Sequence, residues 1–134
     1  MKAKKTDKKR LVLLDSHAII HRAYHALPEF TASSTGEPTG ALYGLVAMLL
    51  KIINELKPDY IMAAFDLAGP TFRHEATESY KAGRAKNDDN LELQLKRSKD
   101  IFKAFGIPIY SCPGFEADDI IGTIVEKCKK LKIE

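Results

Sequence analysis

The sequence predicts an α/β fold in which a parallel β-sheet is flanked by helices. Three short apolar runs, 11–14, 60–65 and 107–112, have the length and composition of buried strands. Amphipathic segments with a helical period separate these runs, and an alternation of strand and helix is typical of parallel sheets. A length of 134 residues, with 45% hydrophobic and 29% charged residues, suits one globular domain with a single core.

Basic residues concentrate at the N-terminus. Residues 1–10 hold six lysines and arginines against one aspartate, so the other 124 residues carry a net charge of −2 although the whole chain carries +3. We expect this tail to be disordered, and nucleic-acid binding has to be inferred from the positions of charges. No apolar run is long enough to span a bilayer, no secretory signal is evident, and Cys112 and Cys128 lack metal-ligand spacing. These features predict a cytoplasmic protein.

The first strand ends at Asp15, and a helix is expected from there to Pro28. His17, His21 and His25 recur every four residues along this helix. Such spacing can bind a transition metal. With no cysteine at ligand spacing and only His74 as a further histidine, three imidazoles on one helix are more often a partly solvated face.

The same helix carries two candidate nucleic-acid contacts, Arg22 and Tyr24. Arg22 is suited to a phosphate and Tyr24 to a base or a phosphate. Packing against another helix is an equal alternative for Tyr24.

A long basic segment follows the second strand. After a loop at 31–39 and an amphipathic helix at about 40–57, the second strand ends in Asp66, and the next residues with helical periodicity begin at 91. The connection 67–90 is longer than is usual in compact domains, which makes it a candidate functional lid. Its cations include Arg73, Lys81, Arg84 and Lys86, with Phe72 and Tyr80 among them. Cations and aromatic rings are what a single-stranded nucleic acid requires, although a solvated loop is the alternative.

Three carboxylates open the last predicted helix. A helix at 91–105 and the strand at 107–112 lead through a turn to Glu116, Asp118 and Asp119. Acidic residues are common at helix N-termini because the helix dipole favours negative charge there. The cluster therefore defines a site only if other carboxylates converge on it.

The carboxyl ends of parallel strands meet at one edge of the sheet, where ligands bind in such folds. Asp15 and Asp66 should lie there, beside the acidic start of the last helix. Carboxylates this close repel unless one stays protonated or a cation binds, and oxygen ligands without cysteine favour Mg²⁺ or Mn²⁺. Two such ions can activate a water and stabilise the leaving oxygen when a phosphodiester is cleaved.

Several motifs in this order resemble the N-terminal part of the bacterial 5′-3′ exonuclease domain. This domain is fused to the front of DNA polymerase I and is a member of the flap endonuclease family. The motifs are LLDS at 13–16, RAYHALP at 22–28, FD at 65–66, FRHE at 72–75, YKAGR at 80–84 and GFEADD at 114–119. The resemblance covers about residues 11–134.

The resemblance implies a PIN-like nuclease core with a helical arch at about 67–90 that threads or clamps a 5′ single strand. The implied ligands of Mg²⁺, directly or through water, are Asp15, Asp66, Glu116, Asp118 and Asp119. Arg73, Lys81 and Arg84 match arch cations that contact the scissile phosphate and its neighbours, and Tyr80 would stack on a base. The expected substrate is DNA with a 5′ flap or nick, and the expected state is a monomer.

One departure from the family pattern concerns the end of the chain. In the family, a further strand with aspartates and an element that grips duplex DNA follow residues 131–133, whereas this sequence ends at Glu134. We therefore expect an incomplete two-metal site, and weak or absent turnover unless another polypeptide supplies the missing aspartates. A polymerase domain is an expected partner in a full-length parent.

Two alternatives to a nuclease stay open from the residues alone. One is a non-catalytic module that holds single-stranded nucleic acid without cutting it. The other is a phospho-acceptor α/β domain, which also uses aspartates at strand ends. Asp15 is not followed by a second aspartate two positions on, and the acidic triplet opens a helix, so the second alternative is weaker.

Overall fold

A computed structural model describes residues 8–82 and 88–134. Its elements are β1 (Leu11–Asp15), α1 (Ser16–Ala26), α2 (Gly40–Leu56), β2 (Tyr60–Ala64), α3 (Phe72–Ala76), α4 (Asp89–Ala104), β3 (Ile109–Tyr110) and α5 (Ala117–Leu131). The three strands form one sheet in the order β1-β2-β3, and both pairings are parallel. The predicted α/β class with a parallel sheet and flanking helices is confirmed.

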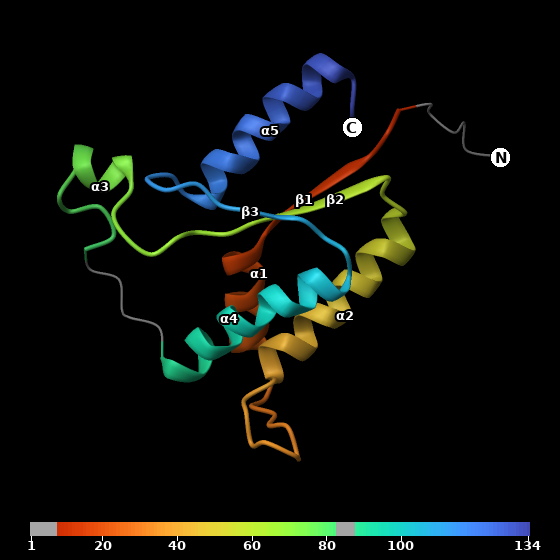
Figure 1. Cartoon of the computed structure of the whole chain (residues 1–134), viewed down its shortest axis with the longest axis vertical. Helices are drawn as coiled ribbons and strands as arrows, with labels where there is room; N and C mark the ends of the chain where they lie inside the picture. Colours follow the sequence, from red (N-terminus) through yellow and green to blue (C-terminus); the bar gives the residue numbers. More distant parts are fainter. Residues whose placement is uncertain (1–7, 83–87) are drawn as a thin grey trace.

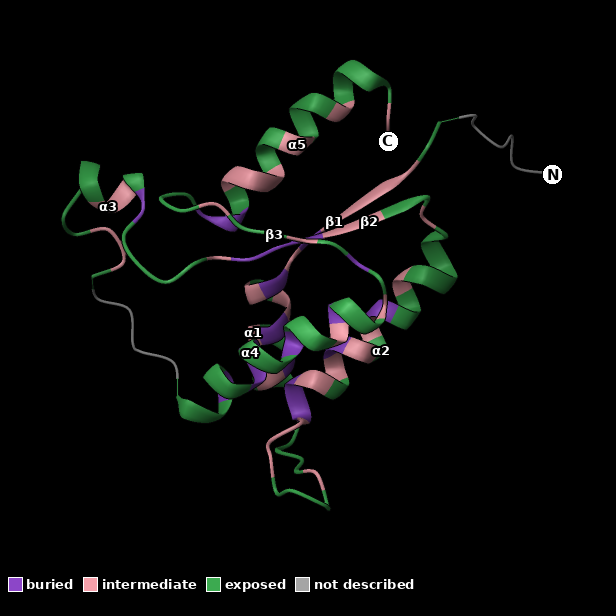
Figure 2. Cartoon of the chain, in the orientation of Figure 1, coloured by how far each residue is buried: buried purple, intermediate pink, exposed green. Residues whose placement is uncertain are grey.

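The sheet lies between two layers of helices (Figure 1). Helices α1, α2 and α4 pack together on one face, and α5 lies against β1 and β2 on the other. Figure 2 shows that burial concentrates where α1, α2 and α4 face one another and the sheet. Phe102, Leu45, Leu49 and Ile20 are fully buried there, whereas the buried residue of α5 is Ala117 at its start. The core is therefore mainly on one side of the sheet.

A side chain of α4 holds the start of α2. The buried Gln94 carboxamide oxygen accepts hydrogen bonds from the backbone N–H of Ala41 at 2.7 Å and of Leu42 at 3.3 Å. The N-cap residue Thr39 makes no side-chain hydrogen bond to the helix. Because an unsatisfied buried donor costs about 1–3 kcal/mol, this polar contact fixes α4 against α2.

The third strand is shorter than the prediction of 107–112. It spans Ile109–Tyr110, because its expected start belongs to the C-terminal cap of α4. Gly106 has a φ of 70°, and the backbone N–H of Ile107 donates to the carbonyl of Phe102 at 2.9 Å. This is the arrangement that closes a helix after a left-handed glycine, so Ile107 is not available for the sheet.

The predicted basic tail falls mostly outside the described residues, since 1–7 are not described. Arg10 is described, and its backbone N–H donates to the Asp59 carboxylate at 2.8 Å. Within 8–82 and 88–134, no helix is both long and apolar enough to cross a membrane.

Helices α1 and α2 approach each other closely at Gly44. A Cβ built there would lie 2.8 Å from the Cβ of Ala23 and 2.9 Å from Cδ1 of Leu27. We therefore expect Gly44→Ala to lower the free energy of unfolding by about 1–2 kcal/mol, although alanine is the better helix former. Urea unfolding measures the change.

The matched control is Gly122→Ala in α5, where the added Cβ would meet nothing within 4 Å. This control should raise the stability by up to about 1 kcal/mol, through helix propensity alone. Changes of the same sign in both variants would contradict the close approach of the two helices.

Candidate metal and nucleic-acid site

Three carboxylates lie together at the carboxyl edge of the sheet. Asp15 ends β1, Asp66 follows β2 and Asp118 lies in the first turn of α5. The carboxyl groups of Asp118 and Asp66 both act on the protonation of Asp15. Burial raises the pKa of Asp15, repulsion by the other two carboxylates raises it further, and a hydrogen bond from Ala18 opposes them. The strand ends therefore create the acidic edge that parallel geometry predicts.

Two of these carboxylates also position the helices around them. Oδ1 of Asp15 accepts from the backbone N–H of Ala18 at 3.2 Å, which makes Asp15 the N-cap of α1. Oδ1 of Asp66 accepts from the backbone N–H of Ala117 at 2.6 Å. The side chain of Asp66 thus ties the end of β2 to the start of α5, where the other acidic residues lie.

Glu116 and Asp119 contact the cations of the segment that contains α3. Arg73 donates through Nη1 and Nη2 to both carboxylate oxygens of Asp119, at 2.7 Å each, and Nη1 also donates to Oε2 of Glu116 at 3.0 Å. The hydroxyl of Tyr80 donates to Glu116 at 3.1 Å, and the ammonium of Lys81 pairs with the same carboxylate. We call these five residues the latch.

The two carboxyl groups of the latch favour the ionised form. The hydrogen bond from Lys81, with smaller contributions from Tyr80 and Arg73, lowers the pKa of Glu116. The hydrogen bonds from Arg73 lower the pKa of Asp119, and the same pair raises the pKa of Arg73. The Glu116 side chain is 10% exposed and that of Asp119 is 20% exposed. Their negative charges are therefore balanced mainly by Arg73 and Lys81 rather than by water.

Local capping explains why the two halves of the latch meet. The backbone N–H of Thr71 donates to Nδ1 of His74 at 3.0 Å at the start of α3. The backbone N–H of Glu116 donates to Asp119 at 2.9 Å at the start of α5. Each contact is the reverse half of a capping box. The backbone N–H of Phe72 then donates to the carbonyl of Gly114 at 2.9 Å, which brings the two helix starts side by side.

The predicted nucleic-acid contacts have different positions. Arg22 is exposed on α1. The hydroxyl of Tyr24 donates to the Asp88 carboxylate at 2.6 Å, which raises the pKa of Tyr24 to about 12 and ties α1 to the N-cap of α4. This contact agrees with the alternative packing role, and a nucleic-acid contact of Tyr24 stays a prediction. Arg84 and Lys86 lie outside the described residues, so their roles stay predictions.

The carboxylate oxygens at the acidic edge are the ligand type that a hard cation prefers, but they are not grouped around a common point. In the part of the chain that the structure describes, no group of three or more His, Cys, Asp or Glu side chains is arranged to hold a metal ion. The carboxylates of Asp15, Asp66 and Asp118 are nevertheless the oxygen ligands that Mg²⁺ prefers. A cation would also relieve the repulsion that raises the pKa of Asp15.

Comparison with known proteins places the chain in a family. Residues 10–134 match the family model described as the 5′-3′ exonuclease, N-terminal resolvase-like domain. The chain belongs to this family. DNA polymerase I of Caldicellulosiruptor bescii is 42% identical over 125 residues, covering 93% of the chain and 15% of that protein. DNA polymerase I of Chloroflexus aurantiacus is 43% identical over 125 residues, covering 92% of the chain and 13% of that protein. The chain thus spans a small part of these relatives.

Solved structures of the T5 D15 protein have a fold similar to that of this exonuclease-family domain. The T5 D15 protein co-crystallised with metal ions matches with a TM-score of 0.64 and 22% identity, over 92% of the chain and 46% of that structure. The bacteriophage T5 D15 flap endonuclease in a pseudo-enzyme-product complex with DNA and metal ions matches with a TM-score of 0.63 and 19% identity, over the same shares. At these identities the similarity shows the fold, and the resemblance drawn from the motifs is confirmed.

The latch of this exonuclease-family domain makes a testable contribution to stability. We expect Arg73→Ala to lower the melting temperature at neutral pH more than Arg73→Lys does, because it leaves Glu116 and Asp119 without their guanidinium partner. The pKa values of both carboxyls are lowered in the fold, so their contribution is present above the unfolded pKa, about 4, and is lost as the pH falls through the folded pKa values. The difference between wild type and Arg73→Ala should therefore shrink in acid.

Melting temperatures measured from neutral to acid pH provide the test. Arg97→Ala is the control, since Arg97 is 54% exposed and its pairs with Glu37 and Asp100 are 3.5 and 3.4 Å long. Exposed pairs of this kind contribute little, so the control should melt near the wild type. An Arg73→Ala difference that stays constant across this pH range would contradict the ionised latch.

Proposed function

We propose that the chain is a metal-dependent 5′-3′ exonuclease or 5′ flap endonuclease domain, which hydrolyses phosphodiesters in DNA at a 5′ flap or nick. The observation that carries this proposal is the convergence of Asp15, Asp66 and Asp118 at the carboxyl edge of the sheet. Next to this edge, the latch holds cations that would suit a phosphodiester. Membership of the exonuclease family and the metal ions and DNA named for the structural neighbours support it.

The acidic edge would hold Mg²⁺ or Mn²⁺. Asp15, Asp66 and Asp118 would be its ligands, directly or through water, and Glu116 and Asp119 would be available once the latch opens. A bound ion of this kind supplies a water of lowered pKa and stabilises negative charge on the phosphate oxygens. Without a cation, burial and, to a smaller extent, repulsion by Asp118 and Asp66 raise the pKa of Asp15.

The cations of the latch would bind the scissile phosphodiester. Lys81 and Arg73 are held next to the start of α5 by Glu116 and Asp119, so their positive charges are already placed beside the acidic edge. On substrate entry they would exchange carboxylate for phosphate oxygens and stabilise the charge that develops in the transition state. Tyr80 would then offer its ring to a base, and Arg22, Arg84 and Lys86 would contact neighbouring phosphates.

Cleavage of a 5′-labelled flap oligonucleotide tests the proposal. We expect at most weak product formation with Mg²⁺ or Mn²⁺, none with EDTA, and loss of this weak activity in Asp66→Asn, which keeps an acceptor for Ala117. Lys103→Ala, on the exposed side of α4, is the control that should cleave normally. Cleavage that persists in EDTA would overturn the proposed mechanism.

A second candidate is a module that binds single-stranded nucleic acid without cutting it. One observation favours it, namely that no ready-made metal-binding group exists among residues 8–82 and 88–134. Salt-dependent binding that persists in Asp15→Ala and Asp66→Ala, with no cleavage at any metal concentration, would favour this module over the nuclease.

A further inference from the structure

A cavity of about 330 Å³ opens beside Asp66. Its walls are His17 of α1, residues 65–68 after β2, and one face of α4 that carries Glu92, Leu95, Lys96 and Lys99. The volume is at the lower end of the range of about 300–1,000 Å³ found for small-molecule sites. None of the predicted nucleic-acid contacts that the structure describes lines this cavity.

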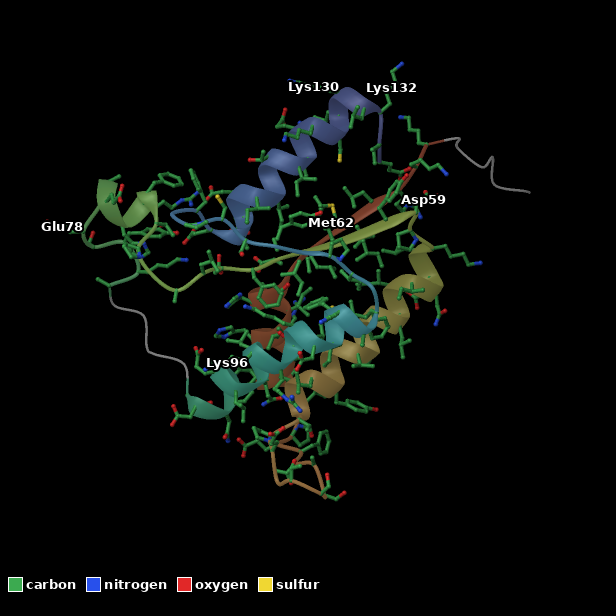
Figure 3. All side chains as sticks on the ribbon, in the orientation of Figure 1. Asp59, Met62, Glu78, Lys96, Lys130 and Lys132 are labelled. Atoms are coloured by element: carbon green, nitrogen blue, oxygen red, sulfur yellow. The ribbon has the colours of Figure 1, made fainter. Side chains whose placement is uncertain are left out.

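Two lysines form the cationic wall of the cavity. Lys96 and Lys99 lie three residues apart on α4, so they share one face of the helix, and Figure 3 labels Lys96 there. The ammonium of Lys99 lies 5.5 Å from the centre of the Phe65 ring, which holds it at the wall. Within the described ranges, neither lysine forms an ion pair.

The imidazole of His17 is held in the wall of the cavity, with Nδ1 also 3.9 Å from Oδ2 of Asp66. The backbone N–H of Asp66 donates to Nδ1 of His17 at 3.4 Å, so in the neutral ring Nε2 carries the proton. The imidazole also packs edge-on against Phe65, with 5.6 Å between ring centres. These two contacts fix the plane of the ring.

We propose that this cavity binds the 5′-terminal phosphate of a nucleic-acid strand. Lys96 and Lys99 would neutralise its charge and His17 would donate a hydrogen bond to it, as phosphate sites require. Leu67 and Leu95 provide an apolar wall for the attached sugar and base. The role of the site in cleavage rests on the proposed function, but phosphate binding itself does not.

Two carboxylates at the cavity should lower its affinity for phosphate. Asp66 lies at one end of the cavity and Glu92 lies on α4, one turn before Lys96. Their negative charges oppose a phosphate, so the cavity has both a cationic and an acidic part. Removing the charge of Glu92 should therefore strengthen phosphate binding, while removing either lysine should weaken it.

Fluorescence anisotropy with a 3′-labelled single-stranded oligonucleotide in EDTA tests the inference, because no strand is cut under this condition. We expect the wild type to bind the 5′-phosphorylated strand about fivefold more tightly than the 5′-hydroxyl strand, the size expected for partly exposed charge pairs. The preference should be lost in the double variant Lys96→Ala/Lys99→Ala. It should be kept in the double variant Lys96→Arg/Lys99→Arg, which retains both positive charges. It should increase in Glu92→Gln.

The control is Lys103→Ala, which removes a cation from the same helix outside the cavity and should leave the preference unchanged. Thymidine 5′-monophosphate should compete with the phosphorylated strand in the wild type and not in the double alanine variant. A missing preference, or one that survives in a double variant with normal circular dichroism, would overturn the proposal. Binding is measured without Mg²⁺ and does not depend on cleavage. The phosphate preference can therefore be present even if the chain proves not to be a nuclease.

Discussion

Asp15→Asn should stabilise the metal-free chain and at the same time remove most of its response to Mg²⁺. Burial and the charges of Asp118 and Asp66 raise the pKa of Asp15, so the fold prefers this side chain uncharged. Asparagine keeps an oxygen acceptor for the N–H of Ala18 and removes the repulsion. We expect a gain in unfolding free energy of up to about 1 kcal/mol, limited by solvent screening, as is common when a functional site is neutralised.

The loss of a charged ligand should weaken Mg²⁺ binding by about a hundredfold or more, since even neighbours of ligands contribute ten- to a hundredfold. Thermal unfolding in EDTA and in a Mg²⁺ series measures both effects. The sign of the pH dependence follows from the raised pKa: the wild type is destabilised above the folded pKa, so the gap between variant and wild type should close as the pH falls through it.

Asp59→Asn is the matched control for this experiment. The hydrogen bond from the Arg10 backbone lowers the pKa of Asp59, so neutralising it should destabilise the chain and leave the Mg²⁺ response unchanged. If Asp15→Asn were destabilising in EDTA, or if its Mg²⁺ response equalled that of the wild type, the assignment of the acidic edge as a metal site would be wrong.

Phe102→Ala should produce the largest loss of stability, about 3–5 kcal/mol, because it removes a large side chain from a fully buried position. The Phe102 ring packs edge-on against Phe65, with 5.6 Å between ring centres and an angle of 90°. Phe65 is 2% exposed and directly precedes Asp66. The cavity left by Phe102 should therefore loosen both the core and Asp66 at the acidic edge.

Guanidinium unfolding followed by circular dichroism measures this loss. Phe102→Leu should cost less, about 1.5 kcal/mol or below, because most of the volume is kept. Phe30→Ala is the exposed control, since Phe30 is 44% exposed. If Phe102→Ala lowered the free energy of unfolding no more than Phe30→Ala does, the Phe102 ring would not be a main part of the core.

The elements and the acidic edge could be predicted because they depend on local patterns and on one rule of sheet geometry. Apolar runs and helical periods located β1, β2, α1, α2, α4 and α5, and parallel pairing required Asp15 and Asp66 to share an edge. The predicted ends of helices were less accurate where a side-chain cap determines the first residue of the helix. Helix α4 begins at Asp89 rather than 91, because Oδ1 of Asp88 accepts from the N–H of Leu91 at 2.8 Å.

The latch and the lysine-lined cavity could not be predicted in the same way. Arg73 and Asp119 lie 46 positions apart, and no sequence pattern pairs them. A backbone hydrogen bond between Phe72 and Gly114, also far apart in the sequence, lies beside this contact. Lys96 and Lys99 line a cavity only because the end of β2 lies opposite α4 in the fold.

The bond between Asp66 and Ala117 gives the site a spectroscopic reporter. A backbone amide that donates to a carboxylate over 2.6 Å has a strongly deshielded proton, and its resonance follows the charge on that carboxylate. An ion or proton that binds the Asp66 carboxylate draws electron density from the oxygen that accepts this hydrogen bond. The chemical shift of the Ala117 amide proton should therefore change with each binding event. A single peak in a nitrogen–proton spectrum thus reads the state of the acidic edge without labelled DNA and without turnover.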